Sequence, residues 1–449
     1  MSVMTRRTFA SLIASPTFAQ TNISPALSAA PNFCSHEHWG SIESIGTFPG
    51  GYRADIVQGA LPTRNTSLFD LLIEPYLRGV LISSGVDRNA LTRPAGWKEF
   101  SALRSVLREY QFNGIFQCTR RGILSLYGID ISALDAVTLT RLDGAIERNY
   151  KSPFGWYRKS MARANFSELI RPVHPEFYRR QESSTSARDE AFTRTVMRID
   201  PFLDFWTGPA ERRSSLSDDS RVEPADAKSW SAFLAYWFDQ AEQNRAVGIK
   251  QLQAYRRDLA FEARSDNDIN DWKGLSSPDA RRKLQDWIVH ECCKQANDRG
   301  WAHQVHVGTH NLPNSSPLPL APLARRYPRM KVVMIHCWPF LEEAGTLARQ
   351  NPNIYIDTCW QPILNPAFFR TAIEQWWNYV PSHKITCGHD ATTVEMAVGS
   401  SLFTREILSD VIQEQKKRFG IREMDLIRAA KNMLHGNAVR IYGGLDSEV

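Results

Sequence analysis

Residues 33–41 read Phe-Cys-Ser-His-Glu-His-Trp-Gly-Ser, and this stretch decides the expected fold. Its apolar start predicts a short β-strand over 33–38, with His36 and His38 towards its end. On a strand, residues two apart point to the same face. The two imidazoles are therefore expected to bind one metal ion from the same side. A single His-x-His pair is a weak signal, so the rest of the chain has to supply further strands and further ligands.

Three later segments supply them. His306 in Gln-Val-His-Val-Gly-Thr, His336 in Val-Val-Met-Ile-His-Cys and Asp390 in Ile-Thr-Cys-Gly-His-Asp-Ala each close a run that is rich in Val and Ile. Alternation along these runs points His306 and Asp390 into the mouth of the fold, and turns His303 and His389 away from it. A structural role is the alternative for each histidine taken singly. Together, neutral imidazoles and one carboxylate favour zinc, with manganese or iron as alternatives.

Zinc with an open coordination position lowers the pKa of a bound water to about 7. Asp390 is expected to be both a metal ligand and the group that takes a proton from that water, and His336 is a second candidate catalytic residue. Lys250 ends the apolar run Ala-Val-Gly-Ile-Lys, where a lysine is unusual. It can extend to solvent, bind an anionic substrate, or carry a carbamate that bridges a second metal ion, so it is a candidate catalytic and metal-binding residue.

Three residues near these segments are candidate substrate contacts. Arg256 follows Lys250 by six residues and can bind a substrate carboxylate through two parallel hydrogen bonds. His310 lies just past its strand, in the expected loop. Trp39 directly follows the histidine pair.

The order of elements predicts the fold class: an α/β protein built as a (β/α)8 TIM barrel, with a large helical insertion after strand 1. Helical spacing of apolar residues over 66–83, 97–127 and 132–150 places that insertion at about 55–160. The polar stretches 207–229 and 264–280 are expected to be surface loops. The barrel domain is expected over 31–445. The eight candidate strands are 33–38, 168–173, 195–199, 246–250, 303–307, 331–336, 353–357 and 384–389.

Composition narrows the functional classes. The chain has 449 residues, 43% of them hydrophobic, and a net charge of +6, so it can bury a large core. Its basic residues are dispersed and no basic-aromatic motif accompanies them, so we expect a small-molecule substrate and no nucleic-acid partner. The seven cysteines form no Cys-x-x-Cys pair, which argues against a disulfide framework. No segment is long and apolar enough to span a membrane. A homo-oligomer is left open.

The N-terminus has its own signal. Arg6 and Arg7 precede a short, modestly apolar run up to Ala19, a pattern typical of a twin-arginine export signal. We therefore expect residues 1–30 to be a signal or disordered segment, cleaved after Ala19 or near 28–30. The expected location is periplasmic or exported. A disordered basic N-terminus on a cytoplasmic protein is the alternative.

These motifs together resemble the amidohydrolase superfamily, in particular its amidohydrolase-related branch of metal-dependent TIM-barrel hydrolases. The resemblance implies that the His-x-His lies on the first strand, single histidines on the fifth and sixth, and the aspartate on the eighth. Binuclear members place a carbamylated lysine where Lys250 stands; the related branch commonly binds one metal ion. Cys34 departs from the family, because many members have an acidic residue nearby. The matching segments are 36–38, 248–250 with 254–256, 305–308, 335–337, 352–357, 388–391 and 436–442.

The leading hypothesis is a divalent-metal hydrolase, zinc-dependent by preference, that acts on an amide, lactone or related bond of a small acidic molecule. The insertion is similar to that of uronate isomerases, so a sugar-acid isomerase is the runner-up, and a decarboxylase is a third hypothesis. A barrel that only binds ligands is the non-enzymatic alternative. The substrate itself is set by loops that vary independently of the barrel.

Overall fold

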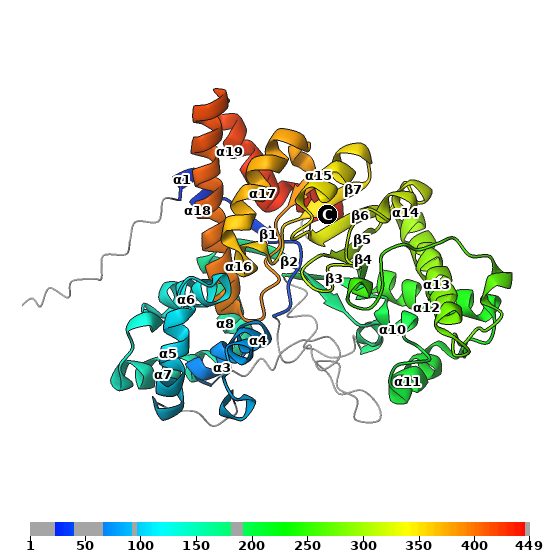
Figure 1. Cartoon of the computed structure of the whole chain (residues 1–449), viewed down its shortest axis with the longest axis horizontal. Helices are drawn as coiled ribbons and strands as arrows, with labels where there is room; N and C mark the ends of the chain where they lie inside the picture. The colour runs from blue at the N-terminus through cyan, green and yellow to red at the C-terminus, as the bar shows by residue number, and fades with distance from the viewer. Residues whose placement is uncertain (1–22, 40–65, 92–96, 181–191, 445–449) are drawn as a thin grey trace, which may run out of the picture.

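The computed structural model describes residues 23–39, 66–91, 97–180 and 192–444. Eight parallel strands form one curled sheet in chain order (Figure 1). α-Helices alternate with the strands from β3 onward, which confirms the α/β barrel class. The strands are β1 (Asn32–Cys34), β2 (Phe166–Val173), β3 (Thr193–Arg198), β4 (Ala246–Gln251), β5 (Ala302–Val307), β6 (Lys331–His336), β7 (Ile354–Asp357) and β8 (Ile385–Thr386).

The first and last strands approach each other just beyond their ends. The backbone N–H of Asp390 donates to the carbonyl oxygen of His36 at 2.9 Å, and the N–H of His389 donates to Cys34 Sγ at 3.2 Å. These bonds join the two edges of the curled sheet on the side where the strands end. In a barrel of parallel strands, the loops at this side carry the chemistry.

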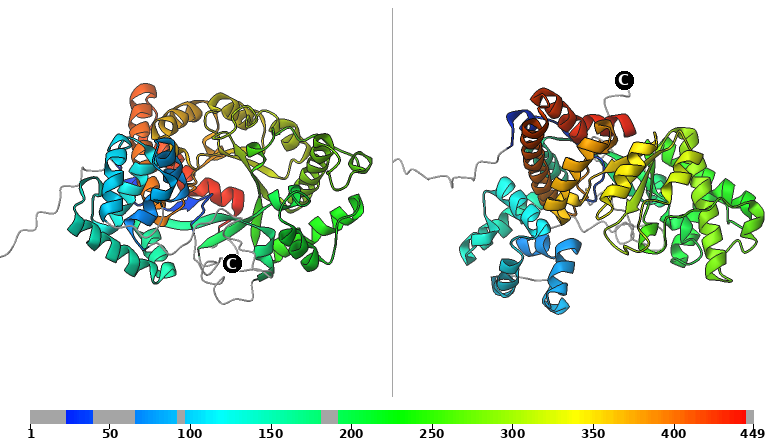
Figure 2. Two further views of the ribbon diagram at one scale, coloured as in Figure 1. Left: turned by 60° about the horizontal axis from the view of Figure 1, so that its bottom comes forward. Right: turned by 45° about the horizontal axis from the view of Figure 1, so that its top comes forward.

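The helices that follow the strands cover the outside of the sheet (Figures 1 and 2). They pack Trp230, Trp237 and Trp376, all nearly fully buried, against outward-facing strand residues such as Val305 and Val307. The helices are α10 (Asp200–Leu203), α11 (Ala210–Ser220), α12 (Ala227–Gln243), α13 (Pro278–Arg299), α14 (Leu320–Arg326), α15 (Leu341–Gln350), α16 (Gln361–Leu364), α17 (Pro366–Tyr379), α18 (Val394–Phe419) and α19 (Glu423–Lys431).

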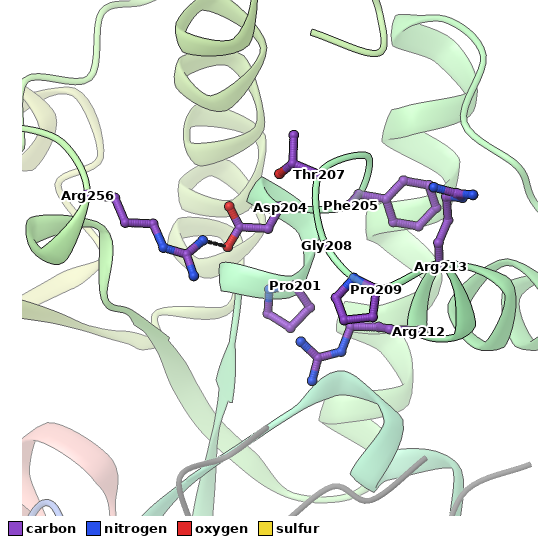
Figure 3. Close-up of a pocket in the computed structure, with 9 residues that line it drawn as sticks. All are labelled: Pro201, Asp204, Phe205, Thr207, Gly208, Pro209, Arg212, Arg213 and Arg256. Carbon is purple, nitrogen blue, oxygen red and sulfur yellow. Dashed lines mark hydrogen bonds and ion pairs between the residues drawn. The ribbon is translucent and has the colours of Figure 1, made fainter. Parts of the chain in front are cut away.

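The expected surface loop over 207–229 is wrong. Helix α11 occupies most of it, and α12 begins inside it with a capping box between Asp226 and Ser229. Pro209 precedes α11 at the turn beside Asp204 (Figure 3). The polar composition suggested a loop because α11 mostly faces solvent. Its fully buried apolar residue is Leu216.

A second helical layer lies between β1 and β2 in the chain: α3 (Leu68–Leu72), α4 (Pro75–Ser83), α5 (Trp97–Glu109), α6 (Gly114–Tyr127), α7 (Ala136–Tyr150) and α8 (Pro153–Arg163). This insertion docks on α18, seen at the left of Figure 1. A Cβ on Gly122 of α6 would fall 1.7 Å from the backbone oxygen of Glu395, and one on Gly399 would fall 1.8 Å from that of Cys118. The two helices therefore cross with their backbones in close approach.

Glu395 of α18 also joins the insertion to the barrel through buried hydrogen bonds. Its buried carboxylate accepts hydrogen bonds from Tyr127 Oη at 2.8 Å, Tyr150 Oη at 2.7 Å and Trp156 Nε1 at 3.2 Å. Three donors from three insertion helices thus converge on one barrel helix. A buried carboxylate without these three donors would destabilise the folded state.

The barrel is closed at the other end by the C-terminal segment. Helix α20 (Asn437–Tyr442) packs Ala438, Ile441 and Tyr442 against interior residues of several strands, among them Phe33. Tyr442 Oη also lies 2.9 Å from the side-chain nitrogen of Gln304, inside the barrel. The interior is therefore a packed core with one accessible end.

The N-terminal boundary is earlier than expected. Helix α1 (Pro25–Ser28) falls inside the segment 1–30, yet Leu27 is fully buried in the main core and its carbonyl accepts a hydrogen bond from Arg405. The folded body thus includes residues from at least 23. Arg6 and Arg7 lie outside the described residues. Among the described residues, no helix is long and apolar enough to cross a bilayer.

Candidate metal centre

Three of the metal-type side chains, those of His36, His38 and Asp390, lie just after their strands, whereas His306 and His336 lie on β5 and β6. Strand β1 ends at Cys34, so His36 and His38 lie in the loop that follows, and strand alternation does not explain why they converge. Strand β8 ends at Thr386, and Asp390 adopts a left-handed backbone with φ of 56°. The expected strands 33–38 and 384–389 are therefore too long. The chain bends at both ends to turn these side chains inward.

Glu37, between the two histidines, fixes that bend. Its buried carboxylate accepts the backbone N–H of His38 at 3.0 Å and that of Ala391, next to Asp390. One side chain thereby ties the loop after β1 to the loop after β8. Burial raises the pKa of Glu37 well above its usual value.

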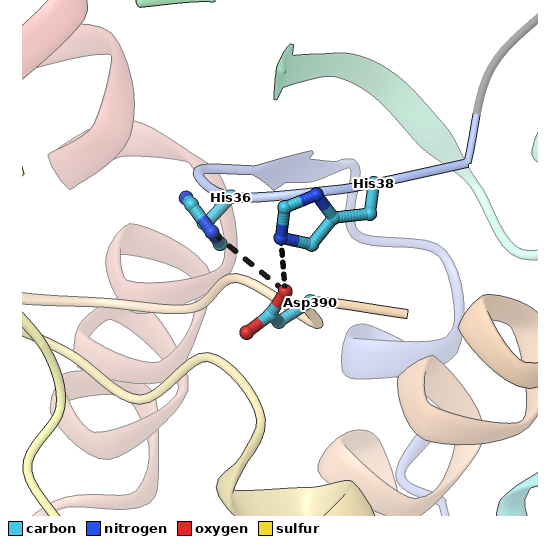
Figure 4. Close-up of side chains that lie close together, drawn as sticks. All are labelled: His36, His38 and Asp390. Carbon is cyan, nitrogen blue, oxygen red and sulfur yellow. Dashed lines mark ion pairs between the residues drawn. The ribbon is translucent and has the colours of Figure 1, made fainter. Parts of the chain in front are cut away.

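The inward-turned side chains meet at Asp390. Its Oδ1 lies 3.0 Å from His38 Nε2 and 3.7 Å from His36 Nε2 (Figure 4), and its Oδ2 lies 3.5 Å from His336 Nε2. His36, His38 and Asp390 form one group whose ligand atoms are all within 4.8 Å of one another, and His336, Cys359 and Asp390 form another. Asp390 belongs to both groups. The predicted ligands from β1, β6 and β8 are thus brought together.

In His36 and His336, a hydrogen bond at Nδ1 leaves the Nε2 atom available to bind a metal ion. The amide nitrogen of Gln304 donates to Ser35 O at 2.8 Å, so its Oε1 faces His36 Nδ1 at 2.8 Å and accepts a hydrogen bond from the Nδ1–H group. The carbonyl oxygen of Cys359 accepts from His336 Nδ1 at 3.1 Å in the same way. Both rings therefore present an Nε2 lone pair towards Asp390. This arrangement orients metal-binding histidines in proteins.

His306 lies at the same end of the barrel, with its ring centroid 4.5 Å from that of His336. Its Nε2 contacts Thr309 Oγ1 at 2.8 Å, while its Nδ1 is buried without a hydrogen-bond partner among the described residues. A buried ring nitrogen without a partner fits a ligand whose bond is to a metal ion. The donor set of imidazoles and one carboxylate therefore suits a divalent metal, and zinc among others.

The protonation states of the histidines and of Asp390 also suit metal binding. Burial lowers the pKa of His336 to about 4, and it lowers those of His36 and His306 well below the usual value. These imidazoles are therefore neutral at physiological pH, the form that binds metals. Burial alone would raise the pKa of Asp390, but His38 and His36 beside it hold the pKa well below the usual value. The carboxylate is thus ionised.

Lys250 lies inside the group. Its Nζ is 3.0 Å from His36 Nε2, and the side chain is 2% exposed. Burial lowers the pKa of Lys250 to about 8. A lysine at this position has a substantial neutral fraction at physiological pH, which is the form that reacts with carbon dioxide or binds a cation. The side chain does not extend to solvent.

An arc of aromatic rings borders the centre, and its main members were not predicted. Ring centroids follow one another from Tyr255 to His310 at 5.1 Å, from His310 to Trp360 at 5.6 Å, and from Trp360 to Tyr76 at 4.7 Å. Tyr76, from α4 of the insertion, also donates its hydroxyl to Asp390 Oδ1 at 3.3 Å. No sequence signal marks Tyr76, because its role depends on how the insertion docks.

The three candidate substrate contacts lie in different surroundings. His310 is exposed and belongs to the aromatic arc. Trp39 is 3% exposed, with its ring 5.0 Å from Tyr157 and its indole N–H without a partner among the described residues. The guanidinium of Arg256 is exposed and pairs with Asp204. The turned-away His303 and His389 bond instead to Gln251 at 3.1 Å and to Asn32 at 2.7 Å.

One family model and one curated protein are similar to parts of this chain. The amidohydrolase family model matches residues 240–444, which contain β4 to β8 and Asp390. Protein fluG of Emericella nidulans is 24% identical over 270 residues, which are 52% of this chain and 30% of that protein. The chain therefore spans less than a third of the length of this curated relative.

Solved structures share the fold across nearly the whole chain. Uronate isomerase from Thermotoga maritima has a TM-score of 0.74 at 12% identity, over 95% of this chain and 99% of that one. Glucuronate isomerase from Caulobacter crescentus has a TM-score of 0.72 at 15% identity, over 95% and 97%. A protein provisionally described as a metal-dependent hydrolase, from Lactobacillus casei, has a TM-score of 0.59 at 17% identity, over 93% and 96%. At these identities the likeness concerns the fold.

Proposed function

We propose that this chain is a member of the amidohydrolase superfamily and a divalent-metal hydrolase that cleaves an amide, lactone or related bond of a small acidic molecule. The observation that carries the proposal is the convergence of the Nε2 atoms of His36, His38 and His336 on the carboxylate of Asp390. Zinc is the preferred ion, because neutral imidazoles and a single carboxylate are typical of catalytic zinc sites.

Each residue has a distinct part in this proposal. A bound divalent metal supplies Lewis acidity towards water and a carbonyl oxygen. His36, His38, His306 and His336 would hold the metal through imidazole nitrogens. Asp390 is ionised and takes up the proton of the attacking water at a carboxylate oxygen, then returns it to the leaving group.

The surroundings support an acidic substrate with a planar or ring portion. Lys250, buried beside His36, supplies a positive charge or, as a carbamate, a second set of oxygen ligands. The arc from Tyr255 to Tyr76 offers ring faces on which a flat or sugar-like group can pack. Trp39 and His310 remain candidate substrate contacts on this proposal.

The test is a substrate panel with a metal assay. The purified chain, loaded with zinc, would be incubated with N-acyl amino acids, lactones and uronates, and metal content would be measured on the same sample. We expect about one equivalent of metal and turnover of an amide or lactone. Bound metal with no hydrolysis of any panel member would refute the hydrolase proposal and leave the metal centre standing.

One observation favours the second candidate, a sugar-acid isomerase. Tyr76 Oη and Asp390 Oδ1 are 3.3 Å apart, so two groups able to carry a proton lie side by side next to the metal ligands. Such a pair suits proton transfer between neighbouring carbons as well as hydrolysis. Conversion of a uronate to a keto acid, followed by NMR, with loss of that conversion in Tyr76→Phe, would establish this alternative.

Export through a twin-arginine route is proposed from residues 5–19 alone. Cleavage after Ala19 would leave α1 intact, whereas cleavage at 28–30 would remove the buried Leu27, so the earlier position is favoured. The full chain and its Arg6→Lys, Arg7→Lys variant would be compared by cell fractionation. Equal export of both would exclude this route.

A further inference from the structure

Two adjoining hollows lie between the segments that follow β3 and β4, and arginines line both. One has a volume of about 160 Å³ and includes Arg212, Arg213 and Arg256 in its lining, as Figure 3 shows. The other has a volume of about 470 Å³ and includes Arg256 and Arg281. Asp204, Thr207 and Arg256 line both, so the two hollows share a wall. We call the pair the arginine hollow.

The arginine hollow is on the same side of the barrel as the metal ligands. Its walls are the segment after β3, which includes α10 and α11, and the segment after β4, which leads into α13. The ring of Tyr255 is 4.4 Å from that of His306, and the next residue, Arg256, points to Asp204 in the hollow. The wall of the metal centre therefore continues directly into the wall of the arginine hollow.

Positive charge exceeds negative charge in this lining. Arg257 and Arg282 are each paired with a carboxylate, those of Asp286 and Asp258. Among the described residues, Arg213 has a contact only with the ring of Trp206, at 5.0 Å, and Arg281 is exposed with no acidic partner. Two guanidinium groups are thus left to bind an anion.

Two buried basic side chains lie side by side at the ends of β3 and β4, between the metal ligands and the segments that form the hollow. Arg198, at the end of β3, is the register partner of Lys250 on β4, and both side chains are buried. Burial lowers the pKa of Arg198, and the carboxylate of Asp200, 3.7 Å away, opposes that shift. In the hollow itself, arginines outnumber the acidic residues Asp204 and Asp279. A cleft lined by one sign of charge concentrates ligands of the opposite sign.

We propose that the arginine hollow is an anion subsite, which binds a carboxylate or phosphate group of the substrate remote from the bond that reacts. This inference rests on the proposed function, since it specifies the acidic substrate as one whose negative group lies away from the reacting bond. Guanidinium groups bind both anions through paired N–H donors, so the chemistry of the hollow accepts either.

The test measures anion binding without turnover. The metal-loaded full chain would be titrated calorimetrically with inorganic phosphate and, separately, with succinate. We expect at least one anion to bind the wild type, and its Kd to rise about tenfold or more in Arg213→Gln/Arg281→Gln, because each charge-assisted bond is worth about a factor of ten. Arg281→Gln alone changes one exposed side chain and should show part of the effect without a folding defect.

Arg325→Gln, an exposed arginine at the end of α14, is the matched control and should leave the Kd unchanged. Tighter phosphate than succinate binding would identify a phosphorylated substrate, and the reverse a polycarboxylate. If neither anion binds, or if the variants bind as tightly as the wild type, the anion subsite is wrong. That result would leave the hydrolase proposal untouched, whereas failure of the substrate panel would leave the anion titration valid.

Discussion

Replacing Glu74 with glutamine should remove a pH-dependent loss of stability that the wild type carries. Glu74 is 4% exposed at the start of α4. Its carboxylate accepts the N–H of Tyr76 at 3.0 Å and the hydroxyl of Thr392 at 2.6 Å, and so joins the insertion to the loop that carries Asp390. Burial raises the pKa of Glu74 from 4.5 to about 7.

The raised pKa of Glu74 determines whether its contribution to stability grows or falls with pH. The folded state binds the Glu74 proton more tightly than the unfolded state, so the proton stabilises the fold below pH 4.5, and this contribution disappears as pH rises through about 7. A shift of this size corresponds to about 3 kcal/mol in total, of which about 2.5 kcal/mol is lost between pH 5 and pH 9. Glutamine retains an oxygen that caps α4 but has no proton to lose.

Urea unfolding of the wild type and Glu74→Gln at pH 5 and pH 9 would measure this contribution. We expect the difference in unfolding free energy to move by about 2.5 kcal/mol in favour of the variant between the two pH values. Glu211→Gln, at an exposed glutamate in the first turn of α11, is the control and should follow the wild type at both. If Glu74→Gln and the wild type change in parallel with pH, Glu74 does not titrate near neutrality and the reasoning fails.

Three further predictions concern the metal centre. His36→Ala together with His38→Ala should abolish metal binding and activity, and full metal retention by mass spectrometry would contradict the ligand assignment. Asp390→Asn should retain much of the metal but lower kcat by orders of magnitude, because the amide cannot accept a proton; near-wild-type turnover would mean that another group is the base. Lys250→Ala should lower metal stoichiometry if Lys250 is a carbamate ligand, and should raise KM with unchanged metal content if it binds substrate.

The sequence predicted the ligands but not the local structure that brings them together. The order of His36, His306, His336 and Asp390 along β-like runs was enough to expect one centre, because parallel strands in a barrel end at the same side. Alternation within a strand was the wrong reason for His36 and His38, which lie in a loop after β1. Their placement depends on Glu37, whose bonds to residues on both sides of the barrel seam could not be inferred from spacing.

Some features that the sequence did not predict depend on contacts between residues far apart in the chain. Tyr76 reaches Asp390 only because α6 docks on α18 through Gly122 and Gly399, and nothing near residue 76 encodes that docking. The segment 207–229 was mistaken for a loop, since a mostly exposed helix has too few apolar residues to show a clear period.

The sequence by itself determined the barrel class, the insertion after the first strand and the identity of the groups that can bind a metal, because these follow from periodicity and residue chemistry. Only the folded structure shows which ring nitrogens face Asp390, how deeply Lys250 is buried, and that arginines gather in the segments after β3 and β4. These properties arise from burial and from partners hundreds of residues apart, such as His36 and Gln304. Local sequence does not specify them, because the dielectric surroundings and hydrogen-bond partners of a side chain exist only once the chain has folded.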